Sequence, residues 1–89
     1  MAQILVTPET LRGKATDVRA YREQHDTVIA NLKTLVAGLS ETWAGNAHTT
    51  FVDNFNGMES TFTQFSEMLE AYAKEMDAFA NKMEENDHL

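Results

Sequence analysis

A repeat of apolar residues in the second half of the chain constrains the fold most. A 3.5-residue repeat of this length is typical of a helix packed along its whole length against other helices. A strand would need steps of two, which the segment lacks. The pattern predicts a helix over about 47–83. Its ten members alternate in steps of four and three: Phe51, Phe55, Met58, Phe62, Phe65, Leu69, Tyr72, Met76, Phe79 and Met83.

The first half carries a similar stripe and predicts another helix, over about 8–39. Thr7, Pro8 and Glu9 form a start signal, because threonine caps a first turn, proline suits its first position and glutamate complements the helix dipole. Arg22 and His25 interrupt the stripe, and either fix the register from inside the seam or lie at its edge. The apolar members are Leu11, Ala15, Val18, Ile29, Leu32, Val36 and Leu39.

The segment between the two stripes, about 40–46, contains the residues that end and restart helices. Serine, threonine, glycine and asparagine cluster there, and the apolar period breaks. A link this short makes the two helices antiparallel neighbours. We therefore expect an all-α fold, a single helical-hairpin domain over 1–89 with a loose tail at 84–89.

Size and burial indicate a second subunit. A chain of 89 residues is marginally stable alone, and this one has no cysteine for disulfides or thiolate metal sites. A single hairpin leaves part of the stripe exposed, and large exposed apolar patches are usually association surfaces. We expect a dimer that forms a four-helix bundle, most simply a homodimer, with a heterodimer of similar chains as the alternative. The expected hairpin and dimer core comprises Leu11, Val18, Ile29, Leu32, Val36, Leu39, Phe51, Phe55, Met58, Phe62, Phe65, Leu69, Tyr72, Met76 and Phe79.

Charge and hydropathy exclude several partners. The net charge is −7, all of it from residues 46–89, so a nucleic-acid backbone is an unlikely ligand. The longest apolar run, at 35–39, is far shorter than the roughly 20 residues that span a bilayer. The acidic polar face of the second helix also disfavours anionic lipid. The first residues lack the basic and apolar regions of a cleaved signal peptide. We expect neither stable membrane insertion nor signal-peptide export.

The chain carries no recognisable catalytic or metal-binding pattern. Its histidines, His25, His48 and His88, lack the spacing of a helical zinc site. Its serines have no glycine-framed nucleophile elbow, and the turn has no phosphate-loop ending. We expect a non-enzymatic protein without cofactor or metal.

The turn carries the motif Trp43-Ala44-Gly45, and its setting is informative. A tryptophan–X–glycine tripeptide at the centre of a short, acidic, cysteine-free helical hairpin resembles the WXG superfamily, the early-secreted-antigen-like substrates of type VII (Esx/Ess) secretion in Gram-positive bacteria. The resemblance covers the whole chain. It implies hairpins that pair antiparallel into four-helix bundles, and export without a cleaved signal peptide, in the folded state, by a machine with an FtsK/SpoIIIE-type ATPase. It also implies a role in virulence or interbacterial competition.

The resemblance assigns the family's turn positions to Trp43 and Gly45. The family's export signal is composite, with the turn tryptophan of one subunit near a C-terminal Tyr-X-X-X-Asp/Glu of its partner. Here Met76 stands four residues after Tyr72, between Glu75 and Asp77, so the strict motif is missing. The segment Tyr72, Glu75 and Asp77 is the candidate for export recognition, and the departure suits a Firmicute member.

Two functions remain open from the residues. The first is an exported homodimer recognised by the secretion ATPase. The second is a cytoplasmic helical adaptor, or a chaperone-like partner of a larger helical toxin. For Trp43, a plug at the end of the bundle and a recognition contact are both compatible with the sequence.

Overall fold

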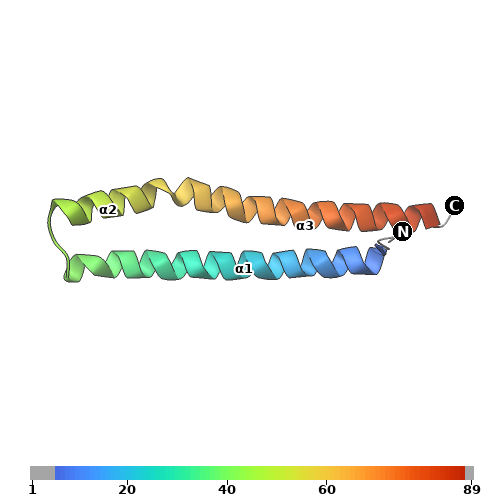
Figure 1. Ribbon diagram of the computed structural model, residues 1–89, viewed down its shortest axis with the longest axis horizontal. Coiled ribbons are helices and arrows are strands. Elements are labelled where there is room, and N and C mark those ends of the chain that lie inside the picture. The colour runs from blue at the N-terminus through green and yellow to red at the C-terminus, as the bar shows by residue number, and fades with distance from the viewer. Residues whose placement is uncertain (1–5, 88–89) are drawn as a thin grey trace, which may run out of the picture.

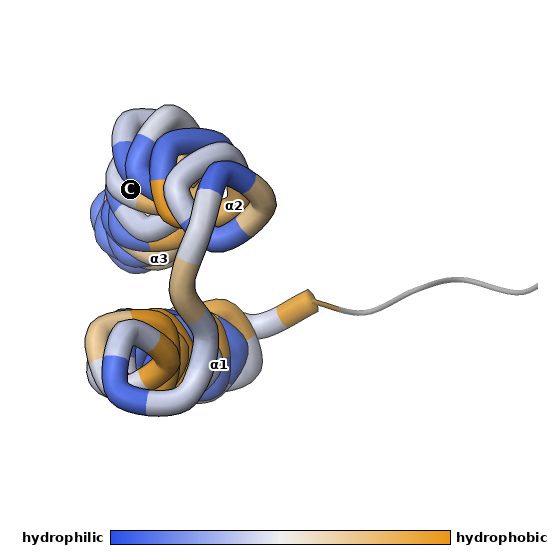
Figure 2. The backbone as a smooth tube through the Cα atoms, turned by 90° about the vertical axis from the view of Figure 1, so that its left-hand side faces the viewer, coloured by the Kyte–Doolittle hydropathy of each residue, from blue (hydrophilic) through white to orange (hydrophobic). Residues whose placement is uncertain are grey.

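The computed structural model describes residues 6–87, which form a long antiparallel hairpin of 67 × 25 × 17 Å (Figure 1). α1 (Pro8–Gly38) leads through a 3₁₀ turn, η1 (Leu39–Glu41), into α2 (Asn46–Gly57) and α3 (Glu59–Asp87). Seen end-on, α1 forms one column and α2 with α3 the other (Figure 2). The predicted all-α hairpin is confirmed. None of its helices has an apolar stretch long enough to cross a membrane.

The start and end of α1 follow from local hydrogen bonds. The Thr7 hydroxyl oxygen accepts from the Thr10 backbone N–H at 3.1 Å, as expected for a capping threonine, and Pro8 occupies the first turn. At the other end, the Trp43 N–H donates to the Leu39 carbonyl oxygen at 2.8 Å. The N–H of Leu39, the first residue of the 3₁₀ turn, donates to the Leu35 and Val36 carbonyl oxygens, so the turn satisfies groups that the end of α1 would leave free.

The predicted second helix, about 47–83, is wrong in two respects. It is divided at Met58, whose N–H donates to the Phe55 carbonyl oxygen at 3.0 Å. Gly57, which ends α2, lowers helix propensity by about 1 kcal/mol relative to alanine, and a Cβ there would meet nothing within 4 Å. The division thus reflects propensity rather than close approach of another backbone.

The second error concerns the tail predicted to be loose at 84–89. Residues 84–87 continue α3. Arg12 of α1 explains the extension, because its guanidinium donates hydrogen bonds to Glu84 and, at 2.9 Å, to the Asn81 side-chain oxygen. Residues 88–89, which include His88, lie outside the described part of the chain.

The contact between the helices is made by small residues. Ala15, Ala73 and Ala80 are fully buried, and Val36 and Ser66 are nearly so. On α3, positions 66, 73 and 80 recur every seven residues, so they form one line along the helix. Side chains this small let the two helix axes approach closely, and Leu69 and Met76 pack beside them half-buried.

Six of the residues expected in the hairpin or dimer core are exposed in this single hairpin. Only Val36 of the expected set is buried, and the other eight are half-buried. The exposed aromatic and aliphatic side chains are 38–52% accessible. In the second half of the chain they follow the edge of the stripe that lies away from α1, because the small buried residues of α3 face α1 instead. The six are Leu32, Phe51, Met58, Phe65, Tyr72 and Phe79.

The shape explains why so little is buried. The radius of gyration is 20.1 Å, whereas a compact chain of this length would have about 12 Å. Two helices in one layer cover only one side of each other. The hairpin therefore exposes most of its large apolar side chains.

Candidate functional site

The turn is shaped by a glycine that no other residue replaces easily. Gly45 has φ +107° and ψ −175°, and it is the one residue with positive φ between positions 6 and 87. This region is accessible essentially to glycine alone. A Cβ at Gly45 would have open space around it, so backbone conformation, and not crowding, requires the glycine. Gly45 precedes α2, and its carbonyl oxygen accepts from the Thr49 N–H at 3.2 Å.

Trp43 packs on the first turns of α2. Its ring lies 5.5 Å from that of His48 and 5.7 Å from that of Phe51, centroid to centroid. The ring is nevertheless 37% exposed, and Phe51 is 42% exposed. His48 Nε2 is buried there without a hydrogen-bond partner among the described residues. The turn therefore presents a partly exposed aromatic cluster at one tip of the hairpin.

The residues predicted for export recognition lie far from this cluster. Tyr72, Glu75 and Asp77 lie near the middle of α3, in the half of the hairpin away from the turn (Figure 1). The helical rise between Asn46 and Tyr72 places them on the order of 40 Å from the turn. Tyr72 is 48% exposed and Glu75 is exposed, whereas Asp77 is half-buried. Asp77 accepts from Arg19 Nη2 at 2.9 Å. The carboxylate of Glu75 is therefore more accessible to a binding partner than that of Asp77.

A continuous row of exposed apolar side chains runs along one flank of the hairpin. Each helix contributes members spaced seven residues apart, and each member is 42–62% exposed. We call this row the apolar ridge. On α3 it lies one residue before the buried small residues, so the ridge adjoins the seam between the helices. Its members are Tyr21, Val28 and Leu35 of α1, and Phe51, Met58, Phe65, Tyr72 and Phe79 of the opposite column.

Ion pairs occupy the opposite flank. In heptad terms most of the paired residues lie four residues after a buried position, as Arg19, Glu70 and Asp77 do. The ridge lies one residue before the buried positions, so the seam separates the two flanks. We call this side the ion-paired flank. It joins Arg12 to Glu84, Arg19 to Glu70 at 3.2 Å and to Asp77 at 2.9 Å, and Lys33 to Glu59 at 3.2 Å.

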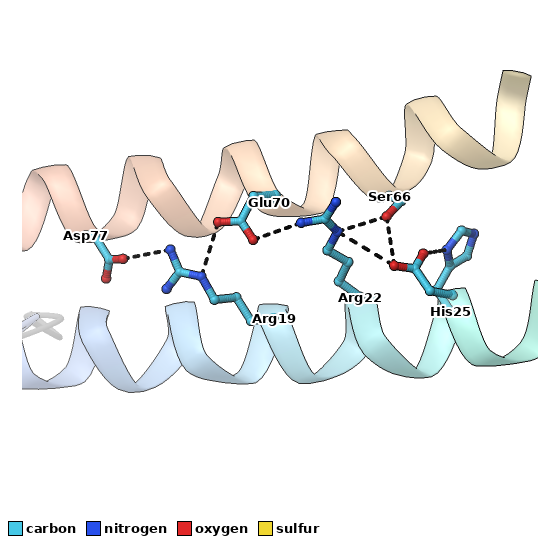
Figure 3. Close-up of polar contacts among 7 residues, drawn as sticks. Arg19, Arg22, His25, Ser66, Glu70 and Asp77 are labelled. Atoms are coloured by element: carbon cyan, nitrogen blue, oxygen red, sulfur yellow. Dashed lines mark hydrogen bonds and ion pairs between the residues drawn. The ribbon is translucent and has the colours of Figure 1, made fainter.

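A polar network crosses the seam near its middle (Figure 3). Arg22 Nε donates to Ser66 Oγ at 2.8 Å, and Ser66 Oγ donates to Asp26 Oδ2 at 3.1 Å. Arg22 Nη1 donates to Glu70 Oε1 at 3.1 Å. Of the two interpretations of Arg22, the position within the seam holds. A polar network of this kind favours the one register in which its members meet.

His25 links this network to the apolar ridge. Its Nδ1 lies 3.1 Å from Asp26 Oδ1, and its ring centroid lies 5.0 Å from that of Phe65. The imidazole is 20% exposed. His25 therefore lies inside the interface between the helices, with a polar neighbour on one side and an aromatic one on the other.

The network lowers the pKa of two carboxyl groups. The pKa of Asp26 is lowered, first by the hydrogen bond with His25 and then by that from Ser66. For Glu70, partial burial favours the neutral acid, but hydrogen bonds and charge from Arg19 and Arg22 outweigh it and lower the pKa. The pKa of Arg19 is raised, chiefly by its hydrogen bond to Asp77. Ionised partners therefore stabilise the hairpin at neutral pH.

The described residues offer surfaces for binding and no arrangement for catalysis. No group of three histidine, aspartate or glutamate side chains between positions 6 and 85 is placed to hold a metal ion. The hollows along the hairpin are shallow and open. A rod of this shape can contact other proteins through its flanks and its two ends.

The sequence analysis did not identify the residues that determine which face of α3 packs against α1. Ser66, Ala73 and Ala80 escaped because alanine and serine contribute little to an apolar stripe. Their spacing of seven was the available signal, since it runs beside the stripe along the same helix. Without that signal, the members of the apolar ridge in the second half of the chain were assigned to the hairpin or dimer core.

Comparison with known proteins agrees with this geometry. An ESAT-6-like protein of Streptococcus agalactiae is 32% identical over 87 residues, covering 98% of this chain and 91% of that protein. The type VII secretion system extracellular protein A of Staphylococcus aureus is 23% identical over 87 residues, covering 98% and 90%. The crystal structure of the secreted protein EsxB from Bacillus anthracis superposes with a TM-score of 0.85 at 25% identity, covering 98% and 99% of the two chains.

These relatives are proteins of Firmicutes, and they agree with the predicted class of secreted, non-enzymatic proteins. The family model described as proteins of 100 residues with WXG, WXG100, matches residues 3–88. The match includes the turn motif and both helical columns. The chain belongs to the WXG100 family.

Proposed function

We propose that this protein is exported by a type VII secretion machine as a homodimer and acts outside the cell through binding. Family membership and the secreted relatives described above support export. The observation that carries the dimer is the apolar ridge, eight exposed side chains in line along one flank. Covering such half-exposed side chains is worth on the order of 1 kcal/mol each.

A second copy suits the ridge for reasons of composition and symmetry. Both halves of the ridge are apolar, so two copies related by a twofold axis match apolar against apolar. The ion-paired flank, by contrast, already satisfies most of its charges within one chain. Two hairpins joined through their ridges form a four-helix bundle, in which the buried ridges become the common core.

Antiparallel docking would also assemble the recognition surface. Within one chain Trp43 and the segment around Tyr72 lie on the order of 40 Å apart along the rod. In an antiparallel pair, the turn of one copy faces the C-terminal half of α3 of the other. We propose that Trp43 and Gly45 of one subunit, with Tyr72 and Glu75 of its partner, form the surface that an FtsK/SpoIIIE-type ATPase recognises.

Asp77 has a lesser part in that surface. Its carboxylate is bound by Arg19 of its own chain, while Glu75 makes no ion pair with the described residues. A carboxylate without an ion pair is more available to a partner. We therefore assign Glu75, and not Asp77, to recognition. Asp77 then serves to hold α3 against α1.

Export is tested in the source cell by probing for full-length protein in culture supernatant and lysate, with and without the secretion ATPase. We expect intact protein outside the wild-type cell, free of lysis markers, and its loss from the supernatant without the ATPase. Protein confined to the lysate in both strains would contradict the proposal.

A further inference from the structure

Two hollows follow one another along the ion-paired flank, on the side of the seam away from the apolar ridge. Lys33 and Glu59 border both, and their ion pair of 3.2 Å separates one from the other. The rings of Phe55 and Phe62 lie 5.8 Å apart beneath that pair, so the apolar floor is continuous. We call the two hollows together the flank groove. Its apolar lining includes Ile29, Ala30 and Phe62 in the first hollow and Val36, Ala37, Val52 and Phe55 in the second.

We propose that the flank groove binds an amphipathic helix of a different protein. That helix would present two apolar side chains seven residues apart, with basic side chains beside them. The second copy of this chain is assigned to the apolar ridge, and in that one respect the inference rests on the proposed function. The groove would remain open in the resulting dimer.

The spacing of the hollows sets the spacing of the anchors. Ile29 lines the first hollow and Val36 the second, seven residues and two helical turns apart. Two turns rise about 10.5 Å along a helix axis. A helix lying along the groove repeats its own side chains at the same interval, so residues i and i+7 would enter the two hollows together.

Acidic side chains outnumber basic ones around the first hollow, where Asp26, Glu59 and Glu67 stand against Arg22 and Lys33, so the rim favours a basic partner. Glu67 borders the first hollow and makes no ion pair with the described residues. Lys33 and Glu59 are each 51% exposed, and an exposed pair of this kind is weak enough for its partners to be exchanged. The chain as a whole carries a charge of −7. An acidic surface of this kind attracts a basic helix.

A designed peptide tests the groove. The probe is a labelled 18-residue helical peptide with leucines at positions i and i+7 and lysines beside them. The matched peptide has the same composition with the second leucine moved to i+5, off the binding face. We expect the first to bind the wild-type dimer at least tenfold more tightly by fluorescence anisotropy. Amide chemical-shift changes should map to residues 29–40 and 52–67.

Variants of two exposed alanines locate the binding. Ala30→Arg and Ala37→Arg each place a long side chain over one hollow and should weaken binding at least tenfold. Ala71→Arg, an exposed α3 alanine outside the groove, is the control and should leave binding unchanged. Sedimentation of each variant checks that its oligomeric state matches the wild type.

Three results would overturn the inference. They are equal affinity for the two peptides, loss of binding in the Ala71→Arg control alone, and shifts confined to the apolar ridge. The last, with dissociation of the dimer, would show that the peptide competes with the second copy. A failed homodimer would appear separately, as a monomer mass in the absence of peptide.

Discussion

Gly45 shows how a single residue controls the turn. Its backbone angles belong to a region that costs other residues about 1–3 kcal/mol, and no neighbouring atom competes for the space of a Cβ. Trp43, two residues earlier, is held by rings of α2 while keeping a third of its surface exposed. The turn motif thus combines a constrained backbone with an available aromatic surface.

Gly45→Ala should lower the free energy of unfolding by about 1–3 kcal/mol, because alanine must adopt a strained backbone or rebuild the turn. Gly57→Ala is the matched control. It also lies in open space, but its backbone is helical, so it should be neutral or stabilise by up to about 1 kcal/mol. Urea unfolding followed by circular dichroism measures both. Equal effects of the two substitutions would contradict the role given to Gly45.

Trp43→Ala should abolish export while leaving the dimer intact. The ring contacts of the indole are with His48 and Phe51 of α2, at the turn, so its removal should leave the α1–α3 seam in place. Secretion is scored by immunoblot of supernatants, and the purified variant is checked by sedimentation and circular dichroism. Loss of helicity or of dimer mass would instead assign Trp43 a structural role, and normal export would remove it from the recognition surface.

At the scale of helices, the pairing of α1 with α3 depends on small residues and charge. Apolar periodicity predicted both helices and the turn, because the period of a stripe follows directly from helix geometry. It could not predict which edge of the stripe faces α1, since residues 62, 69 and 76 are as apolar as 65, 72 and 79. The fully buried Ala73 and the ion pairs on one flank decide that choice.

Ala73→Leu should destabilise the hairpin by about 1–3 kcal/mol. Ala73 is fully buried where the helices approach closely, so added methylene groups force them apart. Ala71→Leu, two residues away and exposed, should change stability by less than about 0.5 kcal/mol. Thermal unfolding compares the two. If Ala73→Leu is as stable as Ala71→Leu, the seam does not pass through Ala73.

Acid should weaken the pairing of α1 with α3. The pKa values of Glu70 and Asp26 are lowered in the folded chain, so ionisation stabilises folding above the ordinary carboxyl range near 4. That contribution is lost as the pH falls through the folded-state values. The Tm of the wild type should therefore fall from pH 7 to pH 3.

Glu70→Gln isolates this effect. It should lower Tm at pH 7, because Arg19 and Arg22 lose their shared carboxylate, and it should show a smaller further drop by pH 3. Glu67→Gln removes a nearby acid that makes no ion pair with the described residues, and should follow the wild type. A pH profile of Glu70→Gln parallel to the wild type would show that Glu70 does not contribute.

At the scale of the whole molecule, the hairpin is a thin rod that separates its functions by face and by end. The ridge lies on one flank, ion pairs and the groove on the other, and the aromatic cluster at one tip. The sequence predicted the need for a partner because the stripe was too broad for one neighbour. It could not predict the separation of faces, which depends on how α3 turns toward α1.

The apolar ridge is the centre of this account, and the mass of the protein in solution tests it most directly. Sedimentation equilibrium at micromolar concentration should give about 20 kDa, twice the 10.0 kDa of one chain. Leu35→Lys, in the ridge and 58% exposed, should give 10 kDa with helicity retained, and Gln64→Lys, exposed on the outer face of α3, should remain at about 20 kDa. A wild-type mass of 10 kDa, or a dimer unaffected by Leu35→Lys, would contradict the assignment of the ridge.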